Sequence, residues 1–166
     1  YRGDNNQVEG FDIDLSYKIA EKLGAELVIE DVEFKNLLPL LESGKIDFIA
    51  AGLTKDPERE KNADFSEVYF NAKQMVIVNA GNDSIESQAD LEGLKIGTQI
   101  GTTGNDIAEE MTGEANVTAY NNDYGASVDL QNEKIDAVII DNEPANKLVS
   151  ANDGIKLVDV GFDDEE

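Results

Sequence analysis

Apolar residues follow two spacings along the chain, and the two alternate from one segment to the next. Short apolar runs, typical of strands, are separated by segments in which apolar residues recur about every three or four positions, as on one face of a helix. The strands predicted in this way cover residues 25–34, 46–53, 73–80, 94–100, 115–120, 135–141 and 155–160. The predicted helices cover residues 15–23, 34–44, 57–66, 103–113, 123–133 and 142–152. This alternation predicts an α/β fold with mostly parallel sheets flanked by helices.

Polar, turn-rich segments interrupt the alternation. Asp4, Asn5 and Asn6 favour the tip of a hairpin. Residues 81–93 separate two apolar sections, so we predict a boundary between two lobes there. The predicted organisation is a first lobe over residues 1–82, a second lobe over residues 83–160 and the start of a return crossover over residues 161–166.

A short internal echo favours two similar lobes. Residues 45–52 and residues 134–141 both begin with Lys-Ile-Asp and continue as an apolar run. A βα idiom shared by chance would look the same. If the echo is a repeat, Gly52 and Asp141 end equivalent strands.

Charge narrows the classes of function. The 166 residues include 36 acidic residues and 13 lysines and arginines, a formal net charge of −23. Nucleic acid binding needs a basic surface, so we expect no nucleic acid partner and no anionic membrane surface. The absence of cysteine and histidine excludes thiol nucleophiles, imidazole acid–base chemistry, disulfides and zinc sites of the His/Cys kind. We expect no metal and no cofactor.

The sequence contains no apolar run of the ~18 residues that a membrane-spanning helix needs. It also contains no recognisable leader peptide. We therefore expect either a cytosolic protein or the processed form of an exported one.

Three predicted strand ends carry distinctive chemistry, and ligands of open α/β sheets bind beyond the carboxyl ends of strands. Gly52-Leu53-Thr54 is followed by Arg59, whose planar fork matches a carboxylate. The turn Gly101-Thr102-Thr103-Gly104 precedes a helix, whose first backbone N–H groups attract anions. Asp141 follows an apolar strand and offers a negative charge. Together these ends predict a site for an anion and a cation held close together, as in a free α-amino acid.

Each feature also has a purely structural interpretation. Arg59 could pair with the neighbouring Glu58 or Glu60 on the surface. The turn at residues 101–104 could be only a capped helix start, since it lacks the lysine of a phosphate-binding loop. Asp141 could be the N-cap of the following helix.

The motifs GFDIDLSYKIAEKLG, LLESGKIDFIAAGLTKDPEREKNADFSEVYF, LKIGTQIGTTG and KIDAVIIDNEPA occur in this order over nearly the whole chain. In these the chain resembles the extracytoplasmic solute-binding proteins of polar amino acid ABC transporters. The resemblance implies a two-lobed periplasmic-binding-protein-like fold of type II, whose lobes close on the ligand about a hinge. The implied ligand-contacting residues are Phe34, Ala51, Gly52, Thr54, Arg59, Gln99, Thr102, Thr103, Ile140 and Asp141.

The resemblance also assigns roles within this set. Arg59 and the Thr103 amide, with Thr102 beside it, match the contacts to the α-carboxylate. The α-ammonium contacts match Gly52, Thr54 and Asp141. Phe34 matches an aromatic that packs on the ligand, although a core position is the alternative. The side-chain pocket matches Gln99 and Ile140, with Ala51 nearby.

The function implied by the resemblance is capture of a polar or small free amino acid and its delivery to an ABC transporter permease. The expected location is extracytoplasmic, either periplasmic or lipid-anchored at the cell surface after removal of a signal peptide. The alternatives are a ligand-sensing extracellular domain of a receptor and, less favoured, a cyclohexadienyl-dehydratase-like enzyme. No general acid or base stands out near the three strand ends, so we expect no enzyme activity.

The sequence departs from the family at both ends. Family members normally have a strand before Tyr1 and further strands and helices beyond Glu166. We therefore expect a shortened chain with an incomplete first lobe. Unpaired strand edges invite pairing with another chain, so we predict domain swapping or dimerisation if the polypeptide ends at residue 166.

Overall fold

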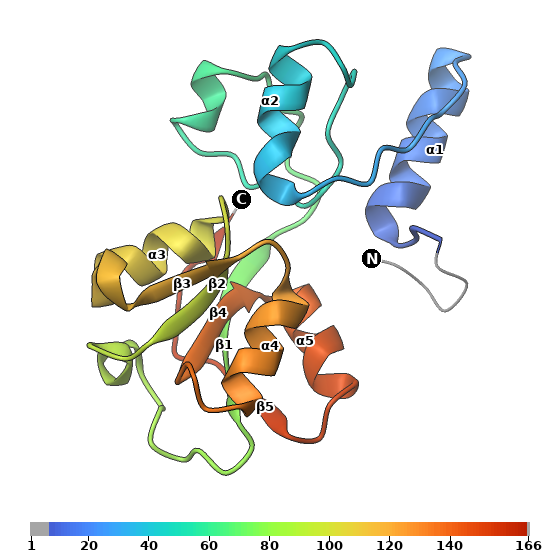
Figure 1. The fold of residues 1–166 in the computed structure, drawn as a ribbon. Coiled ribbons are helices and arrows are strands. Elements are labelled where there is room, and N and C mark those ends of the chain that lie inside the picture. Colours follow the sequence, from blue (N-terminus) through green and yellow to red (C-terminus); the bar gives the residue numbers. More distant parts are fainter. Residues whose placement is uncertain (1–6, 166) are drawn as a thin grey trace. The chain divides into compact units, whose positions relative to one another are not determined.

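The computed structural model describes residues 7–165, and contacts between residues divide the chain into two compact units. The first unit is Tyr1–Glu67 and the second is Val68–Glu166. The predicted hairpin tip at residues 4–6 lies outside the described residues. This division precedes the predicted lobe boundary at residue 82, because strand β1 (Ala72–Asn79) pairs with strands of the second unit (Figure 1).

The first unit holds the helices α1 (Phe11–Leu23) and α2 (Leu37–Glu42) and the short 3₁₀ helices η1 (Phe34–Asn36) and η2 (Arg59–Lys61). Helix α1 ends as the sequence predicts. Gly24 adopts the left-handed conformation, with φ of 66°, and its N–H donates to the carbonyls of Ala20 and Glu21. The acidic residues of the first turn, Asp12 and Asp14, complement the positive end of the helix dipole, so the helix begins at Phe11 instead of Leu15.

Two predicted strands and most of one predicted helix of the first unit are wrong. Residues 25–33 and 46–53 form no strand in the part of the chain that the structure describes, and none of residues 46–53 is buried. A strand is stabilised by ladder hydrogen bonds to a neighbour, and no described strand lies beside these segments. The helix predicted at residues 57–66 shortens to η2, because Asn, Asp and Ser residues favour local turns over helix interiors.

The second unit is built on one mixed sheet, which confirms the α/β class. Its further strands are β2 (Ile96–Gln99), β3 (Val117–Tyr120), β4 (Ala137–Asp141), β5 (Ile155–Val158) and β6 (Asp164–Glu165). The order is β3-β2-β4-β1-β5, with β6 also on β1. Strand β2 runs parallel to β3 and β4, whereas β1 is antiparallel to β4, β5 and β6. The sheet is therefore mixed and not mostly parallel.

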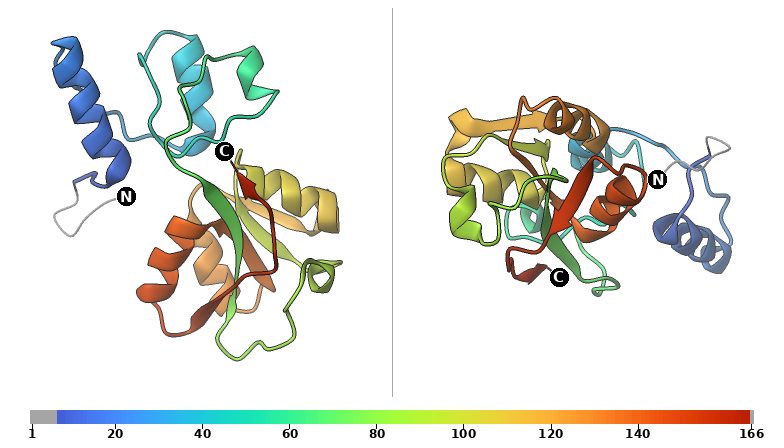
Figure 2. Two further views of the ribbon diagram at one scale, coloured as in Figure 1. Left: turned by 180° about the vertical axis from the view of Figure 1, so that it is seen from behind. Right: turned by 90° about the horizontal axis from the view of Figure 1, so that it is seen from below.

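Helices cover both faces of this sheet (Figures 1 and 2). Helix α3 (Thr103–Thr112) packs on one face, over a buried cluster that includes Val76, Ala108 and Ile139. Helices α4 (Asp123–Gln131) and α5 (Asn142–Ser150) pack on the other, over a cluster that includes Ile77 and Val138. Successive residues along β1 and β4 thus point to opposite faces, which explains why each strand contains a continuous apolar run, residues 75–78 in β1 and 137–140 in β4.

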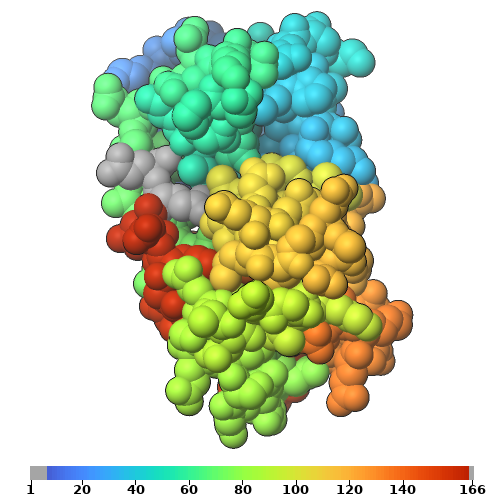
Figure 3. Space-filling view, turned by 90° about the vertical axis from the view of Figure 1, so that its left-hand side faces the viewer, coloured from blue at the N-terminus to red at the C-terminus, as the bar shows by residue number. Residues whose placement is uncertain are grey.

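The polar segment 81–93 belongs to the second unit despite its turn-rich sequence. Ile85 and Leu91 are buried in the cluster beneath α3, and the segment lies beside α3 in Figure 3. A capping box between Ser87 and Asp90 caps the N-terminus of the short helix η3 (Gln88–Leu91). Local hydrogen bonds and the buried side chains of Ile85 and Leu91 therefore hold a segment whose composition predicts a boundary between lobes. A short 3₁₀ helix, η4 (Glu114–Asn116), links α3 to β3.

Candidate functional site

The carboxyl ends of three parallel strands lie at one edge of the sheet in the second unit. Gln99 at the end of β2 pairs with Tyr120 at the end of β3, and Gly97 pairs with Val138 of β4. Each strand leads into a helix, so the N-termini of α3, α4 and α5 follow at this edge. Helix N-termini carry unpaired N–H groups and partial positive charge. The fold thus brings together the predicted turn at residues 101–104 and Asp141.

The turn before α3 is a well-formed helix start. Thr102 is the N-cap, and its hydroxyl accepts from the backbone N–H of Asn105 at 3.3 Å and donates to the carbonyl of Gln99 at 2.9 Å. The capped-turn interpretation is therefore confirmed for the Thr102 side chain. Thr103 is the first helical residue, so its backbone N–H lies at the start of α3, the positive end of the helix dipole.

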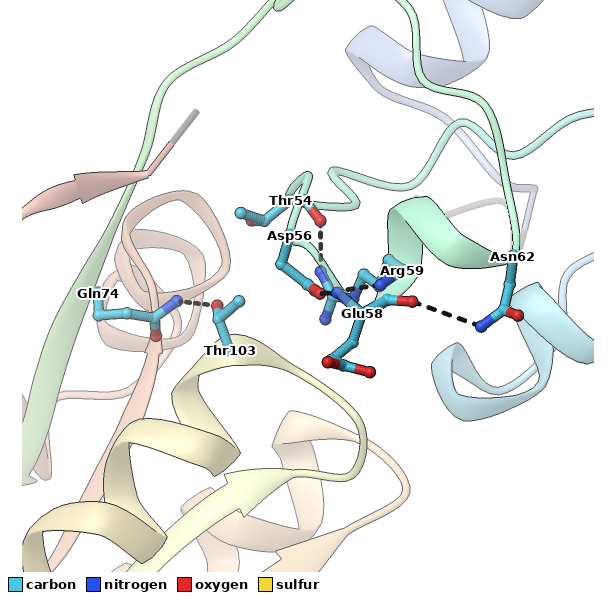
Figure 4. Close-up of polar contacts among 7 residues, drawn as sticks. All are labelled: Thr54, Asp56, Glu58, Arg59, Asn62, Gln74 and Thr103. Carbon is cyan, nitrogen blue, oxygen red and sulfur yellow. Dashed lines mark hydrogen bonds and ion pairs between the residues drawn. The ribbon is translucent and has the colours of Figure 1, made fainter.

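Asp141 occupies the N-cap position of α5, but its side chain makes no capping hydrogen bond. Instead its Oδ1 atom accepts a hydrogen bond from Nε2 of Gln74, which faces it across the β1–β4 pairing. The same nitrogen donates to the hydroxyl of Thr103 at 3.1 Å (Figure 4). The interpretation of the Asp141 side chain as a helix cap is therefore wrong, and the carboxylate is held at the edge of the sheet beside α3.

Asp123 adds a second carboxylate at this edge. It is the first residue of α4. Burial, and to a lesser extent the negative charge of Asp141, raises the pKa of Asp123 to about 6. The sequence signal was present, since Asp123 directly follows the turn after a predicted strand, but the residue could equally be only a helix start.

Arg59 lies in the first unit, in a buried setting. Its side chain is held at two points: Nε lies 2.9 Å from Oδ2 of Asp56, and Nη1 donates to the carbonyl of Thr54 at 2.6 Å (Figure 4). The other oxygen of Asp56 accepts from the backbone N–H groups of Glu58 at 2.8 Å and Arg59 at 2.9 Å. Asp56 therefore fixes both the turn and the guanidinium.

The surface-pair interpretation of Arg59 is wrong. Arg59 is only 9% exposed. Glu58 pairs with Lys61 at 2.5 Å, and Glu60 pairs with Lys55 at 3.0 Å. Asp56, which sequence reasoning missed, could have been found from the Asp-Pro-Glu-Arg stretch, because Asp commonly bonds the backbone of the residues that follow it.

Of the remaining predicted site residues of the first unit, Ala51 and Gly52 lie in a loop and Phe34 begins η1. Gly52 has φ of 56°, a conformation that side chains disfavour. Ala51 is half-buried, and Phe34 is half-buried at the start of η1. Because residues 46–53 form no strand, the expected equivalence of Gly52 and Asp141 as strand ends is not found.

In the second unit, Gln99 and Ile140 lie close to the same edge. Nε2 of Gln99 donates to the carbonyl of Asn121 at 3.3 Å. Ile140 is 7% exposed and packs in the cluster beneath α4 and α5. Packing accounts for Ile140, and its contact with a ligand stays a prediction.

None of the helices in the described residues combines the length and the apolar character needed to cross a membrane.

Curated relatives are amino-acid-binding proteins. The chain is 36% identical over 148 residues to a protein of Campylobacter jejuni named "Probable histidine-binding protein", covering 89% of this chain and 57% of that protein. It is 33% identical over 150 residues to "ABC transporter arginine-binding protein 1" of Escherichia coli K12, covering 90% and 61%. The chain thus spans about three fifths of the length of the curated relatives that it matches.

Solved structures of amino-acid-binding proteins also match this chain. An ancestral arginine-binding protein bound to glutamine matches with a TM-score of 0.93 at 39% identity, over 99% of this chain and 74% of that one. The model of the family described as bacterial extracellular solute-binding proteins, family 3, matches residues 1–145. The chain therefore belongs to the bacterial extracellular solute-binding proteins of family 3.

Proposed function

We propose that this chain binds a free amino acid through its α-ammonium and α-carboxylate groups, as part of a solute-binding protein that serves an ABC transporter permease. One observation carries the proposal. The Asp141 carboxylate is not used to cap α5 and is held beside the N-terminus of α3 by Gln74. The Asp141 carboxylate, which can pair with a cation, and the N-terminus of α3, which attracts an anion, thus lie at the same edge of the sheet. The names of the relatives, which bind histidine and arginine, support amino acids as the ligand class.

In this proposal the second unit recognises both charged ends of the ligand. The backbone N–H of Thr103, with Thr102 beside it, donates to the α-carboxylate, which the positive end of α3 also attracts. Asp141 accepts from the α-ammonium. An ion taken out of water costs free energy unless it is paired, so a ligand that lacks either charge leaves one partner unsatisfied.

The first unit completes the recognition in this proposal. Arg59 donates to the α-carboxylate, while Gly52 and Thr54 accept from the α-ammonium. Asp56 and the Thr54 carbonyl hold the guanidinium in one orientation, so little side-chain freedom is lost when a ligand binds. The ligand side chain contacts Phe34, Ala51, Gln99 and Ile140.

A thermal-shift screen of the twenty common amino acids tests the proposal. A ligand at about 100 times its dissociation constant adds ~2.7 kcal/mol of stability. For a chain of this size the melting temperature should rise by roughly 5–11 °C. Agmatine and N-acetyl-arginine, which lack the carboxylate and the free ammonium respectively, are the matched negative controls for arginine. If no amino acid raises the melting temperature, this chain does not bind amino acids and the proposal fails.

The transport role needs its own measurement. A permease partner predicts that the loaded protein stimulates ATP hydrolysis by its transporter in proteoliposomes, whereas a receptor's sensing domain predicts no such stimulation. The expected location is the extracytoplasmic side of the membrane.

One observation favours a second candidate, a dehydratase acting on a cyclohexadienyl acid. A carboxyl whose pKa is about 6, as for Asp123, can give a proton to a leaving hydroxyl at neutral pH. Incubation with prephenate, followed by NMR, tests this candidate. Unchanged prephenate would exclude this candidate.

A further inference from the structure

Gln74 is a polar side chain at an inward-facing position of a central strand. Along β1, Gln74, Val76 and Val78 alternate onto the face that α3 covers, and Val76 and Val78 belong to the apolar cluster there. Gln74 is itself 1% exposed. Stability alone favours an apolar residue at such a position, so the amide calls for a different explanation.

The amide group of Gln74 links two functional elements that are far apart in the sequence. Nε2 donates to the Thr103 hydroxyl, 29 residues away, and to Oδ1 of Asp141, 67 residues away. A primary amide carries two N–H groups, so both hydrogen bonds form at once. One rigid planar group therefore sets the position of Asp141 relative to the first turn of α3.

The oxygen atom of the Gln74 side chain also indicates a role other than stability. Oε1 is buried and accepts no hydrogen bond from the residues that the structure describes. An unsatisfied buried acceptor lowers stability, and proteins depart from good local packing chiefly at functional positions. Space for the amide comes from Gly104, where a Cβ atom would lie 2.7 Å from Oε1.

We propose that Gln74 is a positioning residue, which fixes the separation between the ammonium partner Asp141 and the carboxylate-binding N-terminus of α3. This inference rests on the proposed function and adds a basis for specificity. In an α-amino acid the two charged groups share one carbon, whereas a β-amino acid separates them by one carbon more. A fixed separation in the protein therefore selects α-amino acids over their β-homologues.

Calorimetric titration of the 166-residue chain with matched ligand pairs tests the inference. The probes are L-arginine against L-β-homoarginine and L-glutamine against L-β-homoglutamine. Gln74→Met keeps the side-chain length and removes both donors. Gln131→Met is the control, because it removes a different amide whose Nε2 bonds Asn152 at 2.8 Å, at the far end of α4 from Asp123.

For Gln74→Met we expect affinity for the α-amino acid to fall about 10- to 100-fold. We also expect the ratio of α to β affinity to narrow, with an unchanged or higher melting temperature. Gln131→Met should keep the wild-type ratio. Thr103→Val, which removes the hydroxyl acceptor and keeps the branched shape, should narrow the ratio to a smaller extent.

The outcomes separate the inference from the function on which it rests. If wild type binds the α-amino acids and Gln74→Met keeps both the affinity and the ratio, the inference is wrong and the proposed function stands. A fall in affinity for both members of a pair by the same factor, with a lower melting temperature, shows a merely structural role and also overturns it. If wild type binds neither these probes nor any common amino acid, both the inference and the proposed function are wrong.

Discussion

Asp123 and Asp141 stand close enough at one edge of the sheet for the charge of one to raise the pKa of the other. Asp141 ends β4, and Asp123 begins α4 after the turn that follows β3. The two residues come together because β2 runs parallel to both strands. The charge at this edge of the sheet therefore changes as Asp123 titrates near pH 6.

The stability of the second unit should depend on the charge of Asp123. Burial and the neighbouring Asp141 raise its folded-state pKa from 3.8 to about 6. A carboxyl with a raised pKa stabilises the folded state below the unfolded-state pKa, and this contribution is lost as pH rises through the folded-state value. Asp123→Asn cannot ionise, so at about pH 8 it should raise the free energy of unfolding by about 1–3 kcal/mol. Urea unfolding at about pH 4 and pH 8 measures the difference.

The matched control for this substitution is Asp153→Asn, which removes one negative charge from an exposed turn. It should leave the pH dependence of unfolding as in wild type. An Asp123→Asn variant with the same pH dependence as wild type would show that Asp123 does not titrate in this range.

Amino acid binding should release a proton near neutral pH, if the proposed function holds. An ammonium placed on Asp141 offsets the charge that opposes ionisation of Asp123, so the Asp123 pKa falls when the ligand binds. Affinity should therefore rise as pH increases through about 6. Calorimetry in buffers of different ionisation enthalpy counts the protons released, and Asp123→Asn should release none from this position. Equal proton release by the variant and wild type would contradict this coupling.

The fold of the second unit follows from the sequence because its signals are local. The apolar run of β4, followed by Asn142-Glu143-Pro144, identifies both the strand and the start of α5. The first unit is different. Residues 46–53 carry a strand-like apolar run, yet they form no strand in the described structure. A strand depends on a partner whose position is a tertiary property, and local spacing cannot supply it.

In the candidate site, too, local sequence identifies some residues, whereas the role of others depends on tertiary structure. Asp141 and the turn at residues 101–104 were predictable, since each is defined by its own strand end. Gln74 was not, because its role depends on the antiparallel register that sets it opposite Asp141. Within its own strand Gln74 is one polar residue in an apolar run, which indicates nothing about its partners. The strand ends therefore point to Asp141 and to the turn before α3, but not to Gln74, which bonds both.

Replacing Arg59 should affect binding and stability together. Arg59→Ala removes the proposed carboxylate donor and leaves the Asp56 carboxylate without its guanidinium partner. We expect affinity for the amino acid to fall by about 100-fold or more and the free energy of unfolding to fall by about 1–3 kcal/mol. Lys61→Ala, which breaks only the exposed pair with Glu58, should change stability by less than about 0.5 kcal/mol and leave affinity as in wild type. Calorimetric titration and urea unfolding measure the two effects, and full affinity in Arg59→Ala would remove Arg59 from the site.

A methyl group on Gly104 should act through Gln74. In Gly104→Ala the added Cβ would lie 2.7 Å from Oε1 of Gln74 and 3.3 Å from the carbonyl oxygen of Ile139. Relief of this clash displaces the amide from Thr103 and Asp141, so we expect a loss of about 1–3 kcal/mol of stability. Combined with Gln74→Ala, the same change should cost much less, since the shorter side chain makes room for the methyl group. Gly81→Ala is the control, because no atom lies within 4 Å of its added Cβ. Urea unfolding of wild type, Gly104→Ala, Gln74→Ala and the double variant completes the cycle, and additive losses would show that Gly104 and Gln74 act independently.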